Sequence, residues 1–155
     1  MAYYIGLDIG TSAAKVLLCD QAGKILAIAQ QEYPLYSPKP LWSEQNPADW
    51  WQGSVQAIQQ LLAESTISPS QVTGIGLTGQ MHGSVFLDRN HQVIRPALLW
   101  NDQRTAAECE EITEKVGYDR LIEITGNPAL TGFQAPKILW FIISIKVTVE
   151  ARLDP

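Results

Sequence analysis

The sequence predicts an α/β protein with a mixed β-sheet and flanking helices. Three short apolar segments in the first 33 residues alternate with turn residues, which is typical of consecutive strands. A helix with a clear start follows at Pro47, and a further strand returns near residue 72. With 46% hydrophobic and 17% charged residues, the composition is that of a globular chain rather than a disordered one.

The first three predicted strands form an antiparallel meander. Tyr3–Gly10 and Ala14–Asp20 are short, apolar and bounded by turn residues. A tight turn containing Gly23 leads into the third strand, Lys24–Tyr33. Because consecutive hairpins place successive strands side by side, these segments predict one antiparallel half of the sheet.

A long helix follows a proline-rich loop. Asn46 is a favourable N-cap and Pro47 suits the first helical position. Apolar residues then recur at helical spacing as far as Glu64: Trp50, Trp51, Val55, Ile58, Leu61 and Leu62. The segment Val72–Leu77 is a strand that contains two glycines, which favours close approach of its backbone to a neighbour or ligand.

The remaining predicted elements, which follow residue 83, are short strands and helices. They are a strand pair Ser84–Leu87 and Val93–Leu98 around a turn at Arg89–Asn90, helices Gln103–Val116 and Tyr118–Ile124, and a helix that begins at Ala135–Trp140. The alternating, β-branched segment Ser144–Val149 has the pattern of a strand. The order of elements is not the strict strand–helix alternation of a Rossmann domain.

Charge and cysteine content narrow the possible partners. The net charge of −5 argues against general binding to nucleic acid or to an anionic membrane. No apolar stretch reaches the roughly 18 residues of a bilayer span, and no secretory signal begins the sequence, so we expect a cytoplasmic protein. Cys19 and Cys109 lack metal-ligand or redox spacing and are expected to be reduced.

The first motif with chemical content is Asp8-Ile9-Gly10-Thr11-Ser12, followed by Lys15. Glycine lets a backbone approach an anion, and hydroxyl and N–H groups in such a turn can cradle phosphate. Asp8 offers an oxygen ligand for Mg²⁺, and Lys15 offers a point charge for phosphates. An ordinary hairpin turn would use the same residue types, so the motif alone leaves both interpretations open.

Two further motifs suit a ligand with many hydroxyls. Gly79-Gln80-Met81-His82-Gly83 combines an open backbone with polar groups and an adaptable apolar wall. Leu99-Trp100-Asn101-Asp102-Gln103-Arg104 adds an aromatic ring for a sugar face, while Asn101, Asp102 and Arg104 can bind hydroxyls or brace one another. The alternatives are a glycine-rich turn with a surface histidine, and a helix capped by Asn101 or Asp102 with Trp100 in the core.

These motifs together resemble the FGGY family of carbohydrate kinases. Gly6–Lys15 is similar to the family's first phosphate motif, and the other two motifs resemble its members that phosphorylate D-xylulose. The resemblance implies a ribonuclease-H-like domain of the actin/hexokinase superfamily, with ATP and Mg²⁺ as cofactors. It implies that ATP and Mg²⁺ bind at the first motif (Asp8, Gly10, Thr11, Ser12, Lys15) and a ketose at the other two (Gln80, Met81, His82, Trp100, Asn101, Asp102, Arg104).

The resemblance also has limits. It covers roughly residues 3 to 140. Residues 1–140 are expected to be an incomplete N-terminal domain, whereas 141–155 look like an atypical tail. Family members are much longer, and their catalytic aspartate lies downstream, so no catalytic residue is assigned in this chain and we expect little activity from it alone. A homodimer is compatible with the sequence. The alternatives are another FGGY pentulose or sugar kinase and a non-catalytic binding module.

Overall fold

The computed structural model describes residues 2–150, and these form two compact units. The first unit comprises residues 2–35 and 45–80, and the second comprises 36–44 and 81–150. The first motif lies in the first unit and the third motif in the second, whereas the second motif crosses the boundary, with Gly79 and Gln80 in the first unit and Met81–Gly83 in the second.

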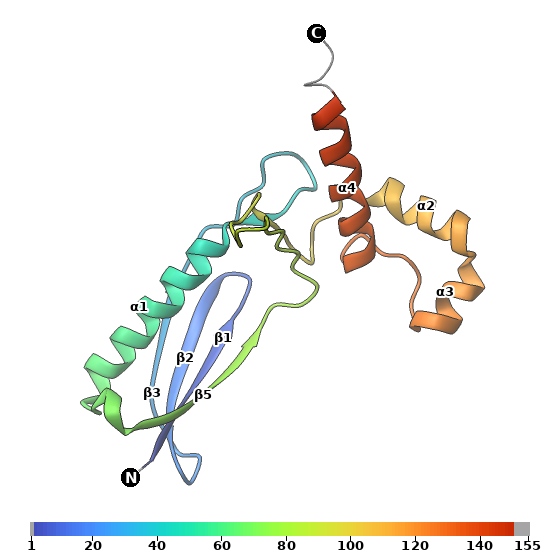
Figure 1. The fold of residues 1–155 in the computed structure, drawn as a ribbon. Coiled ribbons are helices and arrows are strands. Elements are labelled where there is room, and N and C mark those ends of the chain that lie inside the picture. Colours follow the sequence, from blue (N-terminus) through green and yellow to red (C-terminus); the bar gives the residue numbers. More distant parts are fainter. Residues whose placement is uncertain (1, 151–155) are drawn as a thin grey trace. The chain divides into compact units, whose positions relative to one another are not determined.

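The first unit is a four-stranded mixed sheet with one helix against a face (Figure 1). Strands β1 (Tyr3–Ile9), β2 (Ala13–Asp20) and β3 (Ile25–Glu32) are antiparallel neighbours, and β5 (Val72–Gly79) pairs in parallel with β1. The strand order is β3-β2-β1-β5. The predicted meander and the returning strand are confirmed, with ends within a residue or two of the predicted positions.

Side-chain alternation explains how this sheet builds its core. The apolar residues of β1 and β2 that point to the helical side are buried, whereas Asp8 and Lys15 lie on the opposite, exposed side. Helix α1 (Pro47–Ser65) buries Gly53, Ala57 and Leu61, which recur every four residues along one face. The core of the unit consists of Ile5, Leu7, Ala14, Val16, Leu18, Ala29, Tyr33, Ala57 and Leu61.

Helix α1 begins as the sequence predicts. The side chain of Asn46 accepts a hydrogen bond of 3.1 Å from the amide of Ala48, and Pro47 occupies the first turn. Its C-cap residue Thr66 is in the left-handed region at φ 58°, and a short 3₁₀ turn at Pro69–Gln71 leads into β5. This connection returns the chain parallel to β1, as a strand–helix–strand crossover requires.

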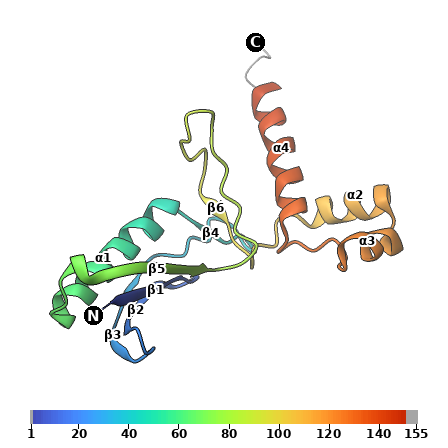
Figure 2. The ribbon, with the colours of Figure 1, turned by 60° about the horizontal axis from the view of Figure 1, so that its bottom comes forward.

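The second unit is mainly helical. Helices α2 (Ala106–Val116), α3 (Tyr118–Thr125) and α4 (Gln134–Glu150) follow one another, and α2 contacts both of the others (Figure 2). Gly117 and Gly126, both with positive φ, end α2 and α3. Two-residue strands β4 (Glu44–Gln45) and β6 (Ala97–Leu98) pair with each other, and Glu44 is the member of β4 that belongs to this unit.

Two predicted elements of this unit are wrong. The predicted strand pair at 84–98 reduces to isolated bridges, Ser84–Leu98 and Leu87–Val93, and to β6. Pro96 explains part of this difference, because proline cannot donate to a strand ladder. The alternating segment Ser144–Val149 is not a strand, since α4 continues through it. Residues 151–155 of the predicted tail lie outside the described residues.

Candidate functional site

The turn between β1 and β2, residues Gly10-Thr11-Ser12, is here named the phosphate loop. The amide of Gly10 donates to the carbonyl of Ala13 at 3.0 Å, which closes the turn. A Cβ on Gly10 would lie 3.3 Å from that same carbonyl oxygen. Glycine is therefore favoured here by the tightness of the turn, whatever the loop binds.

All three carbonyl groups of the phosphate loop accept hydrogen bonds from the rest of the unit. The Tyr33 hydroxyl donates to the Gly10 oxygen at 2.5 Å, and the Tyr33 amide donates to the Ser12 oxygen at 3.2 Å. The side-chain amide of Gln45 donates to the Thr11 oxygen at 2.6 Å. In a trans peptide the N–H points opposite to the C=O, so the amides of Thr11 and Ser12 are directed away from these supports. An anion placed on that side meets N–H dipoles rather than carbonyl oxygens.

Asp8 and Lys15 flank the loop on the exposed face of the sheet. They are direct register partners in β1 and β2, and Asp8 is also opposite Thr78 of β5. Together with the backbone at Gly76, these three residues line an open hollow of about 330 Å³. The Asp8 charge also affects Tyr33, whose hydroxyl bonds to the loop. Burial is the larger cause and the Asp8 carboxylate the smaller, and together they raise the pKa of Tyr33 to about 12.

Gln80, which we assigned to the sugar, is bound to the phosphate loop. Its backbone amide donates to the Ile9 oxygen at 2.8 Å, and its side-chain oxygen accepts from the Thr11 hydroxyl at 3.2 Å. Its side-chain amide donates to Gln45 at 2.9 Å, and the same Gln45 oxygen accepts from Trp50 at 2.9 Å. This arrangement exists because the parallel strands β1 and β5 end side by side, with Ile9 opposite Gly79. The first and second motifs therefore meet at residue 80.

Met81 and His82 continue from Gln80 into the second unit. Both side chains are exposed, with Met81 at 61%. His82 has a positive φ of 57°, and its ring lies 4.7 Å from the ring of Phe133, centroid to centroid. The two predicted sugar residues of this motif are thus accessible on a turn of unusual backbone conformation.

The third motif divides into exposed and buried residues. Trp100 is 43% exposed, and the side-chain oxygen of Asn101 is buried with no hydrogen-bond partner in the part of the chain that the structure describes. Asp102 is fully buried, and its carboxylate accepts from the amide of Ser43 at 2.7 Å and from the Arg104 side chain at 2.6 Å. Of the alternatives left by the sequence, the structure shows Asp102 and Arg104 bracing one another. The alternative in which Asn101 or Asp102 caps the helix is not the one observed, since α2 begins with Thr105 as its N-cap residue.

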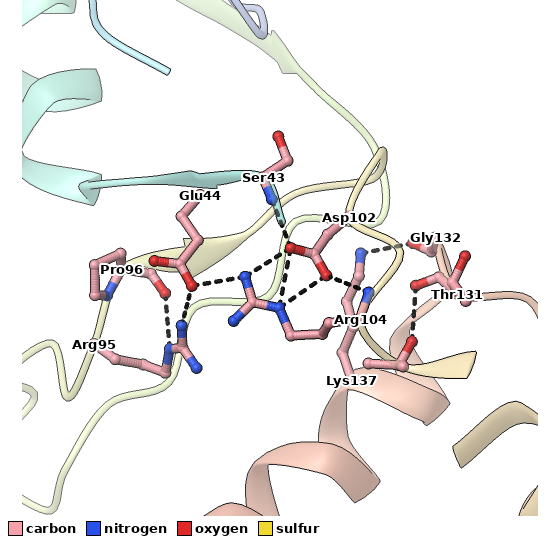
Figure 3. A network of polar contacts seen from close by, with 10 residues as sticks. Ser43, Glu44, Arg95, Pro96, Asp102, Arg104, Thr131, Gly132 and Lys137 are labelled. Atoms are coloured by element: carbon pink, nitrogen blue, oxygen red, sulfur yellow. Dashed lines mark hydrogen bonds and ion pairs between the residues drawn. The ribbon is translucent and has the colours of Figure 1, made fainter. Parts of the chain in front are cut away.

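Arg104 is the centre of a buried polar network (Figure 3). Its side chain is 1% exposed, and one nitrogen lies 2.6 Å from Glu44 and 2.6 Å from Asp102. Arg95 also pairs with Glu44. The Arg104 guanidinium carbon lies 3.6 Å from the ring centroid of Trp42 and 4.9 Å from that of Trp140. Such planar stacking together with bidentate pairing suits arginine and would not suit lysine.

Four supporting residues were missed by the sequence analysis: Tyr33, Glu44, Gln45 and Lys137. The first three lie in or beside a segment predicted only as a proline-rich loop, where no periodicity marks a buried polar residue. The sequence did contain a signal for Lys137, because it is the one charged residue in the otherwise apolar start of a helix, Ala135–Trp140. Its side chain is fully buried in the structure.

The described part of the chain contains no cluster of three or more His, Cys, Asp and Glu side chains suited to hold a metal alone. Mg²⁺ in phosphoryl-transfer sites is usually bound by one or two carboxylates together with substrate phosphates. A single exposed carboxylate, Asp8, beside a turn whose amides face away from its supports fits that mode. Within residues 2–150, no helix combines the length and apolar character needed to cross a bilayer.

Comparison with known proteins identifies the family. Residues 3–149 match the N-terminal domain of the FGGY family of carbohydrate kinases. The chain is 48% identical over 140 residues to a xylulose kinase of Bacillus subtilis and 43% identical over 137 residues to one of Escherichia coli. These alignments cover 90% and 88% of this chain and 28% of each relative.

A solved structure gives the same result. The crystal structure of a xyloylose kinase from Brucella ovis superposes with a TM-score of 0.83 at 43% identity, covering 89% of this chain and 28% of that one. The predicted fold, the mixed-sheet domain of the sugar kinases, is thereby confirmed. The chain spans between a quarter and a third of the length of the relatives it matches. It belongs to the FGGY family of carbohydrate kinases, whose N-terminal domain it matches.

Proposed function

We propose that this chain is the N-terminal part of an ATP-dependent kinase that phosphorylates D-xylulose to D-xylulose 5-phosphate. The observation that carries the proposal is the meeting of the first two motifs where β1 and β5 end. Gln80 bonds to Ile9 and Thr11, so the turn that would hold phosphate is directly joined to the segment that would hold the sugar. Ligands of open α/β sheets bind at the carboxyl ends of parallel strands, where this junction lies.

Phosphoryl transfer needs little covalent chemistry from the protein and depends on positioning and charge. The phosphate loop supplies amides held in orientation by Tyr33 and Gln45. Lys15 adds positive charge on the face where Asp8 lies, and Asp8 is the residue that would hold Mg²⁺, directly or through water. When bound, Mg²⁺ neutralises phosphate charge. The resemblance to the family implies that the proton acceptor for the sugar hydroxyl lies outside the matched part.

The sugar side of the proposal uses the exposed residues of the other two motifs. Met81, His82 and Trp100 offer an apolar wall, hydrogen bonds and an aromatic face, and Asn101 offers an amide whose oxygen has no partner among residues 2–150. Asp102 and Arg104 are buried against each other, so we assign them to support of the Trp100–Asn101 segment rather than to contact with sugar. The choice of D-xylulose rests on the xylulose kinases among the relatives.

Calorimetric titration tests the proposal with this chain. Mg-ATP and D-xylulose are each titrated into the wild type, Asp8→Asn and the control Asp119→Asn, which removes an exposed carboxylate at the start of α3. We expect saturable binding of both ligands, and Asp8→Asn should weaken Mg-ATP binding about tenfold, about 1.4 kcal/mol, without affecting D-xylulose. Equal effects of the two substitutions on Mg-ATP, or no saturable binding of either ligand, would contradict the proposal.

A coupled assay for ADP release tests the expectation about activity. We expect the isolated 155-residue chain to release little ADP with D-xylulose present, since the expected base lies outside it. Turnover in the ordinary kinase range, about 1–100 per second, would show instead that the chain contains a base we have not assigned. In the calorimetric titration, glycerol in place of D-xylulose separates a preference for the ketose from general binding of polyols.

A further inference from the structure

The first turns of α4 contact the turn that carries Met81 and His82. Lys137 donates from Nζ to the His82 carbonyl at 2.6 Å and to the Gly132 carbonyl at 2.6 Å. One turn earlier, the Gln134 side chain donates to the Gly83 carbonyl at 3.1 Å and accepts from the Ser84 hydroxyl. Residues 82, 83 and 84 are thus each held by a side chain from the same face of one helix.

Lys137 is an unusual residue for this task. Its side chain is fully buried, and lysine is almost never fully buried without a carboxylate partner. Here the partners are two backbone carbonyls, and no carboxylate lies within ion-pair distance among the described residues. A neutral amine has two N–H donors and an ammonium has three, so the two carbonyls match the donors of the neutral form and leave one donor of the ammonium over. Burial is the largest cause and lowers the pKa of Lys137 to about 8; the Asp102 charge opposes this by raising the pKa, and the smaller effect of the Arg104 charge lowers it further.

The backbone that Lys137 holds needs such support. His82 is one of only a few non-glycine residues with positive φ in the described chain, at 57°. A non-glycine residue in this region is strained and persists where its surroundings fix it. The hydrogen bond from Lys137 holds the His82 carbonyl, and the contact with the Phe133 ring holds the His82 side chain. Ser84 is fixed in addition by its paired backbone bonds to Leu98.

We infer that Lys137 is a positioning residue of the ketose site, which holds the Met81–His82 turn in the conformation that meets the sugar, with Gln134 as its helper. This inference rests on the proposed function, because it takes Met81 and His82 as the residues that contact the ketose. Lys137 does not touch the sugar itself: it is buried beneath the turn and acts through the His82 carbonyl. The Mg-ATP side is unaffected, because the phosphate loop has its own supports in Tyr33 and Gln45.

The test compares Lys137→Met with a matched control, Lys115→Met. Methionine keeps the length of the lysine stem and removes its donors, and Lys115 is an exposed lysine on α2 paired with Glu111. Two readouts are measured on the full chain. One is amide hydrogen exchange in residues 81–84, with residues 25–32 of β3 as the internal reference. The other is the dissociation constant of D-xylulose and of Mg-ATP by calorimetry.

We expect Lys137→Met to accelerate exchange in 81–84 and to weaken D-xylulose binding, each by about tenfold, with exchange in β3 and Mg-ATP affinity unchanged. A merely structural role would weaken both ligands or neither. Unchanged D-xylulose affinity in a folded Lys137→Met chain overturns the inference. If that variant does not fold, Gln134→Ala decides, because Gln134 is exposed at the helix start and its loss should weaken D-xylulose binding about threefold.

The two proposals fail in different ways. If the wild type binds no ketose, the proposed sugar site is wrong, and exchange in 81–84 alone then decides whether Lys137 holds the turn. If the wild type binds D-xylulose and neither substitution changes the affinity, the proposed function stands and the role of Lys137 is wrong. Exchange in 81–84 that is equal in wild type, Lys137→Met and Gln134→Ala removes the structural basis of the inference altogether.

Discussion

Replacing Arg104 with methionine tests the buried network of the second unit most directly. The substitution removes the shared cation from two buried carboxylates, Glu44 and Asp102, and a stacked ring partner from Trp42. Breaking a buried ion pair by removing one partner typically costs about 3–5 kcal/mol. Each carboxylate keeps another donor, Arg95 for Glu44 and the Ser43 amide for Asp102. We therefore expect Arg104→Met to lower the opening free energy of this unit by an amount near the lower end of that range, about 3 kcal/mol.

The assay must resolve the two units, because a single unfolding transition cannot be assumed for a chain with two compact parts. Amide exchange followed by mass spectrometry reports the opening free energy of peptides from residues 97–116 and, as reference, from 13–32. The control Arg120→Met removes an arginine whose side chain is 63% exposed and paired with Glu123. This exposed pair is expected to contribute at most about 1 kcal/mol to the opening free energy.

A second substitution tests why Arg104→Met lowers the stability. If the cost arises from an uncompensated carboxylate, Asp102→Asn in the Arg104→Met background should restore about 1–2 kcal/mol. Arg104→Met that behaves like Arg120→Met would refute the reasoning, since it would mean that the two carboxylates need no cation. A loss of about 3 kcal/mol that Asp102→Asn does not relieve would assign the cost to lost packing on the tryptophans instead.

Three further predictions concern the phosphate loop, helix α1 and the buried lysine. Gln45→Ala removes the donor to the Thr11 carbonyl and should weaken Mg-ATP binding about tenfold by calorimetry, whereas an unchanged affinity would show that the loop is held without it. Gly53→Ala places a Cβ 2.9 Å from the Tyr33 ring and should cost about 1–3 kcal/mol in urea unfolding; a gain, as at an open helix position, would contradict this. Lys137 binds its proton at about pH 8 when folded and at about 10.5 when unfolded, so the unfolded state holds more protons between these values. The stability of the wild type relative to Lys137→Met should therefore rise from pH 8 to 10.5 and stay level below pH 8, and a difference independent of pH would disprove the lowered pKa.

Local chemistry in the sequence was enough to predict the first unit. Asn46 and Pro47 start α1 where predicted, because the cap and the fixed φ of proline act within one turn. The alternation in Tyr3–Gly10 places Ile5 and Leu7 in the core and Asp8 on the open face, as a two-residue period requires. The composition of the phosphate loop also predicted its tight turn, since Gly10 has to fit against the Ala13 carbonyl.

The second unit was harder to predict because its structure depends on distant contacts. The pattern of Ser144–Val149 alone fits a strand, yet the helix begun at Gln134 continues through it, with Phe141 stacked on Phe86 at 3.7 Å between centroids. A short apolar run cannot separate strand from buried helix by its period. Asp102 likewise suits a helix cap by residue type, but its carboxylate is bound by Arg104 and Ser43, the latter 59 residues earlier in the chain.

The segment between β3 and α1 shows why a loop without periodicity can determine two sites. Tyr33 and Gln45, at its ends, hold the carbonyls of the phosphate loop, whereas Glu44 holds Arg104 in the other unit. Glu44 and Gln45 are consecutive, so their side chains point to opposite sides of an extended backbone, and each is buried. A one-residue shift in one direction would exchange Gln45 for Glu44 at the Thr11 carbonyl, and a shift in the other direction would exchange Glu44 for Gln45 at the two arginines. Both exchanges are unfavourable, because a carboxylate cannot donate to a carbonyl and an amide cannot balance two cations. The length and register of this segment are therefore expected to be constrained more tightly than its composition suggests.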